Sequence, residues 1–161
     1  MPTAGYTLKL DPWAAEYQGM VQIGDEAEPA TVDIRVERAV WEAVRPMAGP
    51  VAVRIAFVDG VRRIEHRLLI GDGERTVFGL LGSFGVGAVC VDSTARVGHE
   101  TTGRVLVTGG GLKLPAFDAP VDARLTLRFE PQSEPENEPT TPLDGLQTAM
   151  RRNEAGLAER L

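Results

Sequence analysis

The stretch from Val51 to Arg67, VAVRIAFVDGVRRIEHR, most constrains what this chain can fold into. Its first half is apolar on nearly all of both faces, which is typical of a central strand covered on both sides. Asp59 and Gly60 interrupt that pattern, and a basic segment follows. The sequence therefore predicts an apolar strand that ends at Asp59, a bend at Gly60 and a second strand over Arg63–Ile70.

Other alternating segments predict more strands, and two short motifs predict local turns. A turn is expected at Asp11-Pro12-Trp13 and a short helical turn at Ala39–Val44, which ends before Pro46. A further turn is expected at Glu100–Gly103. The expected strands are Tyr6–Leu10, Thr31–Glu37, Thr76–Asp92, Thr94–His99, Arg104–Thr108 and Val121–Phe129. This succession predicts an α+β fold built on a mainly antiparallel mixed sheet with few helices.

The last thirty residues predict a linker and a helix. Glu130–Thr141 (EPQSEPENEPTT) is acidic and proline-rich, so an extended linker is expected. Thr141, Pro142 and Asp144 are typical of a helix start. One apolar stripe then follows, made of Leu143, Leu146, Met150, Leu157 and Leu161. The expected organisation is a β-rich domain over 1–129, a linker over 130–141 and an amphipathic helix over 142–161. This helix folds onto the sheet, binds a partner or belongs to a longer chain.

Composition narrows the class of protein. At 161 residues the chain suits one domain with appendages, and no apolar run approaches the length of a membrane span. No signal-peptide pattern is present at the N-terminus, and the single cysteine, Cys90, precludes an intramolecular disulfide. A cytoplasmic location is therefore expected. The net charge of −6 argues against non-specific coating of nucleic acid, although Arg62, Arg63 and Arg67 gather beside Asp59.

Three segments resemble, in order, the N-terminal part of bacterial NurA-family nucleases. They are Asp11-Pro12-Trp13 with Glu16-Tyr17, FVDGVRRIE from Phe57 to Glu65, and GLLGSFGVGAVCVD from Gly79 to Asp92. The resemblance implies a ribonuclease H-like sheet and Mn²⁺- or Mg²⁺-dependent cleavage of DNA in end processing and repair. It also implies a HerA-like helicase as partner. The first acidic metal ligand of this family lies in an Asp-Gly motif at a strand end, which Asp59 and Gly60 match.

The candidate site consists of few residues. The resemblance makes Asp59 the catalytic metal ligand, with Glu65 and Asp92 as the best local supplements and Arg62 and Arg63 as phosphate contacts. Each has a plainer interpretation: Asp59 and Asp92 as turn residues, and the other three as solvated polar side chains. One aspartate cannot hold two metal ions, so the remaining ligands are expected from a C-terminal continuation beyond Leu161 or from a homodimer. The alternative is a non-catalytic β-rich module that docks a protein through its C-terminal helix.

Overall fold

The computed structural model describes residues 5–11, 40, 49 and 54–161 of the chain. Backbone contacts divide the chain into two units, Gln18–Val53 and the combination of Met1–Tyr17 with Arg54–Leu161. All elements described below belong to the second of these. Several predicted features lie outside the described residues. They are the strand at 31–37, the helical turn at 39–44 apart from Val40, Pro12-Trp13 of the first turn, and Val51–Val53.

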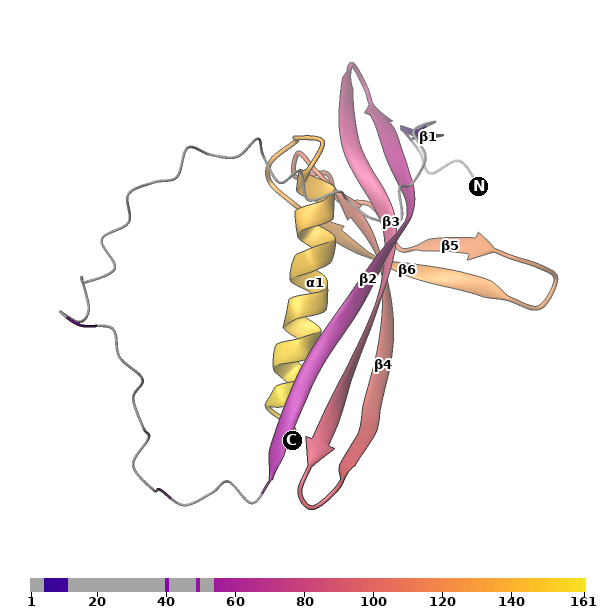
Figure 1. Cartoon of the computed structure of the whole chain (residues 1–161). Coiled ribbons are helices and arrows are strands. Elements are labelled where there is room, and N and C mark those ends of the chain that lie inside the picture. Colours follow the sequence, from indigo (N-terminus) through magenta and orange to yellow (C-terminus); the bar gives the residue numbers. More distant parts are fainter. Residues whose placement is uncertain (1–4, 12–39, 41–48, 50–53) are drawn as a thin grey trace. The chain divides into compact units, whose positions relative to one another are not determined.

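The described chain forms a mixed six-stranded sheet and one C-terminal helix, which confirms the α+β class (Figure 1). The strands lie in the order β1-β2-β3-β4-β6-β5. Neighbouring strands are antiparallel except β4 and β6, which run parallel. The bounds are β1 Tyr6–Leu10, β2 Ile55–Asp72, β3 Arg75–Val91, β4 Ala95–Thr108, β5 Phe117–Pro120, β6 Thr126–Ser133 and α1 Thr141–Ala158.

Strand β2 runs through Asp59 without interruption. Asp59 pairs with Gly87, and Gly60 pairs with Val86, in the middle of the antiparallel ladder of β2 and β3. The predicted strand end at Asp59 and the bend at Gly60 are therefore wrong. The two predicted strands are one strand, because the polar residues that broke the apolar pattern lie on an exposed surface and not in a loop.

Strand β4 is also continuous, so the turn predicted at Glu100–Gly103 is wrong. Val86 pairs with Thr101 and Ala88 pairs with Gly98, so β4 carries an extra residue opposite Gly87. His99 lies at this irregularity and has a φ of 60°. Strand β2 has a similar irregularity between Ile64 and His66, which leaves Glu65 without a partner in the register. Such β-bulges bend a strand and increase its twist.

The two faces of the sheet carry two separate hydrophobic clusters. Helix α1 covers one face, and the β5–β6 hairpin packs against the other; Figure 1 shows them on opposite sides of the long strands. The α1 cluster contains Leu80, Phe84, Val86, Ala88, Val105, Val107, Leu146, Ala149, Met150 and Leu157. The hairpin cluster contains Leu68, Ile70, Val77, Leu81, Leu106, Leu112 and Phe129.

Among the described residues, those that cover the hairpin face lie near one end of the long strands. Further along, the same face is formed by residues 55–63 of β2, 83–91 of β3 and 95–104 of β4. We call this surface the open face. It carries Ile55, Phe57, Val61 and Val97, which are 45%, 60%, 74% and 73% exposed and belong to neither cluster.

The predicted amphipathic helix is confirmed as α1, and it packs on its own sheet. Leu146 is fully buried, and Ala149, Met150 and Leu157 are nearly so. The helix comes close to the sheet where the strands carry glycine: a Cβ on Gly82 would lie 2.7 Å from Leu146 Cδ2. Within the described residues, no helix is both long and apolar enough to cross a bilayer.

The acidic segment before α1 is attached to the sheet. Strand β6 extends to Ser133, inside the predicted linker, whereas Val121–Leu125 forms the tip of the β5–β6 hairpin. The Gly110 and Gly111 amides donate hydrogen bonds to the carbonyls of Glu136 and Glu134. Asn137 accepts from the Phe78 amide at 3.0 Å and donates to the Thr76 carbonyl at 3.0 Å. An extended linker over 130–141 is therefore wrong for its first residues, because backbone and amide groups replace the apolar contacts that this sequence lacks.

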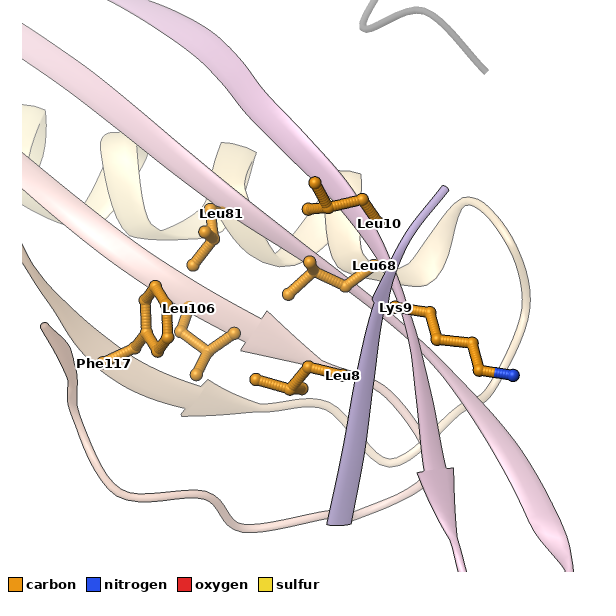
Figure 2. A pocket seen from close by; sticks show the side chains of 7 residues that line it. All are labelled: Leu8, Lys9, Leu10, Leu68, Leu81, Leu106 and Phe117. Carbon is orange, nitrogen blue, oxygen red and sulfur yellow. The ribbon is translucent and has the colours of Figure 1, made fainter. Parts of the chain in front are cut away.

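The large apolar side chains of β1 also meet the hairpin face. Figure 2 shows a small pocket between β1 and Phe117 of β5, with Leu68, Leu81 and Leu106 of the three central strands as its floor. Leu8 and Leu10 of β1 form its side, while Lys9 points away from these leucines. Among the described residues that line this pocket, Lys9 alone has a polar side chain.

Candidate functional site

Asp59 lies in the middle of a rigid strand, on the face opposite α1. Its neighbours Val58 and Gly60 face the helix: Val58 packs against the α1 cluster, and a Cβ on Gly60 would lie 2.9 Å from Met150 Cγ. Because side chains alternate along a strand, Asp59 points out of the open face. Its side chain is exposed, and Oδ1 accepts a hydrogen bond of 2.8 Å from the Gly60 amide.

A second carboxylate lies across the sheet from Asp59. The strand between them carries Gly87, which has no side chain to separate the two. Glu100 of β4 leans over this glycine, since a Cβ on Gly87 would lie 3.6 Å from Glu100 Cγ. A shallow groove at this point is lined by residues 59–61, 85–87 and 100–102.

Glu100 was missed by the sequence analysis, which placed it in a turn. The alternation Gly85-Val86-Gly87 in β3 is the signal that could have revealed it. Glycine at every second position of a buried strand clears one face of side chains. Polar residues on the neighbouring strands then become the functional candidates on that face.

Oxygen donors of the kind that Mn²⁺ and Mg²⁺ accept lie along this groove. Asp59 and Glu100 supply carboxylate oxygens, and Thr102 supplies a hydroxyl on the same groove wall. Mg²⁺ is commonly bound through one or two carboxylates while it keeps several waters. Among residues 5–11 and 54–161, no group of three or more His, Cys, Asp or Glu side chains is placed to hold an ion. Within the described residues, Asp59 and Glu100 are therefore a pair of carboxylates on one face and not a complete set of metal ligands.

The structure does not bring Glu65 or Asp92 to Asp59. Glu65 is six positions further along β2, a separation of about 20 Å at about 3.3 Å per residue. It accepts a 2.5 Å hydrogen bond from the Ser83 hydroxyl and forms an ion pair with Arg63 at 3.4 Å. Asp92 lies five positions beyond Gly87, about 17 Å away.

Asp92 caps the turn between β3 and β4. Its Oδ1 accepts hydrogen bonds from the amides of Ser93 and Thr94 at 2.5 and 3.2 Å, and Oδ2 lies 3.5 Å from Arg96. The backbone donation from Ser93 and then from Thr94 lowers the pKa of Asp92 below its ordinary value of 3.8. This confirms the interpretation of Asp92 as a turn residue.

We expect Asp92→Ala to lower the urea midpoint of unfolding at neutral pH. The folded-state pKa of Asp92 is depressed, so its stabilisation is present above the unfolded pKa and is lost as pH falls through the folded value. The difference between the two proteins should therefore shrink below about pH 4. Urea unfolding at several pH values measures this, with Glu74→Ala in the β2–β3 turn as the control. A difference that stays constant down to pH 2 would contradict the capping role.

The two arginines of the candidate site point to opposite faces. Arg62 lies on the α1 face, and its Nε donates a 2.5 Å hydrogen bond to Gln147 of the helix. Arg63 lies on the open face with Asp59, and its register partner is Ser83, which in turn pairs with Arg104 of β4. Arg63 and Arg104 therefore flank Ser83 on the surface that carries the two carboxylates, whereas Arg62 holds the helix against the sheet.

No protein-family model matches this chain, and no curated protein matches it.

Proposed function

We propose that this chain is part of a NurA-like, metal-dependent DNA nuclease with a ribonuclease H-like relationship. The observation that carries the proposal is the pair of Asp59 and Glu100 on one exposed sheet face, separated only by Gly87. The three segments that resemble the NurA family include two of these residues, Asp59 and Gly87. DNA is the expected substrate, and a HerA-like helicase in the cytoplasm is the expected partner.

Asp59, Glu100 and Arg63 have the functional roles in this proposal. Asp59 and Glu100 would hold one Mn²⁺ or Mg²⁺ ion, which when bound polarises a phosphodiester and lowers the pKa of a coordinated water. Arg63 on the same face would attract the phosphate backbone. The remaining ligands would be water molecules or acidic side chains of a second copy or of the helicase complex, because two carboxylates leave most coordination positions of the ion open.

The experiment combines metal binding with cleavage. We expect the purified chain to bind Mn²⁺, and Asp59→Asn and Glu100→Gln each to weaken that binding at least about tenfold, as measured by calorimetry. Glu65→Gln and Asp92→Asn are the matched controls and should leave Mn²⁺ affinity unchanged. Mn²⁺-dependent cleavage of single-stranded DNA should likewise require Asp59. Cleavage or Mn²⁺ binding that survives Asp59→Asn would refute the assignment of this site.

A second candidate function is a protein-interaction module. The exposed apolar residues of the open face favour it, because single domains rarely expose a contiguous apolar surface without a partner. Helix α1 is a poor docking element, since its apolar stripe is buried against its own sheet. A double variant with neutral polar side chains, Phe57→Gln with Val97→Gln, should then lower self-association in sedimentation experiments without affecting Mn²⁺ binding.

A further inference from the structure

Phe57 is an exposed aromatic residue beside Asp59. It lies two positions earlier on β2, so both side chains point out of the open face about 7 Å apart. Its ring is 60% exposed. Its register partner is Val89 of β3, which pairs with Val97 of β4, so the ring has an apolar row next to it. The strand fixes this ring at a defined distance from the carboxylate.

Positive charge lies on the other side of Asp59 on the same face. Arg63 is four positions further along β2, about 13 Å from Asp59. Arg104 is two positions before the hairpin-cluster residue Leu106, which places it on this face as well. Within the described residues, Arg104 forms no ion pair. The open face thus presents, in order, an aromatic ring, a carboxylate pair and two guanidinium groups, of which that of Arg63 is paired with Glu65.

We propose that Phe57 stacks on a nucleobase of the DNA strand held at Asp59, and that the open face accepts DNA as a single strand. The inference rests on the proposed nuclease function and adds a residue that binds an unpaired base of the substrate. An aromatic ring combined with cations that follow the backbone is how proteins bind single strands without sequence preference. The guanidinium groups provide the charge complementarity to phosphates that the apolar row alone lacks.

The geometry favours a single strand over a duplex. In a duplex the base faces are stacked on each other and are not available to a side chain, so Phe57 could only touch the sugar-phosphate edge. An unpaired base can turn its face to the ring while its phosphates reach Arg63 and Arg104. Asp59 and Glu100 repel phosphates unless a divalent ion is bound between them and the DNA, so binding should depend on that ion.

The test measures DNA binding by the full chain with Ca²⁺ as the divalent ion. The probes are a fluorescent oligothymidylate of about 16 nucleotides and a duplex of equal length. We expect Phe57→Ala to weaken binding of the single strand by about 5- to 100-fold and to change duplex binding little. Phe57→Trp should restore single-strand affinity, whereas Phe57→Leu should not. Val97→Ala, in the same apolar row, is the matched control and should have no effect.

The outcomes separate this inference from the proposed function. If the chain binds and cleaves DNA but Phe57→Ala and Phe57→Leu bind single strands as tightly as the original, the stacking role is refuted and the nuclease stands. Equal losses for single strand and duplex would also refute stacking. If Phe57 governs single-strand binding but Asp59→Asn leaves Mn²⁺ binding intact, the stacking role holds and the metal site fails. Circular dichroism of each variant verifies that it is folded.

Discussion

Leu146→Ala should lower the free energy of unfolding by about 3 kcal/mol, within the range of about 2–5 kcal/mol found for buried leucines. Leu146 is fully buried between α1 and the sheet, and its methyl groups lie over Gly82, which has no side chain that could move into the space. The cavity would therefore remain open. The lost stability combines the transfer free energy of the removed atoms with the cost of the cavity. Urea unfolding followed by far-UV circular dichroism measures the change.

The matched control for this prediction is Leu125→Ala at the hairpin tip. Leu125 is 48% exposed and belongs to neither hydrophobic cluster, so its truncation should change stability by no more than about 0.5 kcal/mol. Equal effects of the two substitutions would mean that α1 does not pack on the sheet through Leu146. The helix would then be available to a partner, as the sequence-based alternative had it.

Gly109→Ala should destabilise the protein by about 3 kcal/mol, because a Cβ there would lie 2.7 Å from the carbonyl oxygen of Glu136. That oxygen belongs to the backbone, so the 134–137 segment must move away as a whole. Its hydrogen bonds to Gly110, Gly111, Phe78 and Thr76 would then be strained or lost, at about 1 kcal/mol each.

Gly98→Ala is the control for this second prediction. A Cβ on Gly98 meets no atom within 4 Å, so the substitution should be nearly neutral. Hydrogen exchange of the Phe78 amide reports the attachment directly, because its acceptor is the Asn137 side chain. A Gly109→Ala protein that keeps both its urea midpoint and its Phe78 protection would show that the acidic segment is a free linker after all.

The sequence was informative where the apolar pattern of an element continues unbroken along its length. The stripe of Leu146, Met150 and Leu157 predicted α1, and the alternation of Tyr6–Leu10 and Thr76–Asp92 predicted β1 and β3 closely. It failed where a long strand has one covered and one open face. Asp59-Gly60 and Glu100–Gly103 look like turns locally, because polar and glycine residues in the open half of a strand have the composition of a loop.

The candidate site, like the fold, could be predicted from the sequence only in part. Asp59 could be selected from its sequence, but its neighbour across the sheet could not, since Glu100 reaches it only through the register of β3 and β4. Glu65 and Asp92 were selected for proximity in sequence, and the length of β2 and β3 separates them from Asp59. The β-bulges at Glu65 and His99 were equally invisible, because a single extra residue has no sequence signature when the strand continues beyond it.

Those two bulges have a consequence for how copies of this chain behave in concentrated solution. Both lie on strands that flank β3: the bulge in β4 kinks one border of the open face, and the bulge in β2 lies just beyond the end of the other. A kinked border offers an irregular row of amides and carbonyls to an incoming strand, which discourages edge-to-edge aggregation. The polypeptide can thus keep a broad apolar surface accessible to a ligand without recruiting further molecules into a growing sheet.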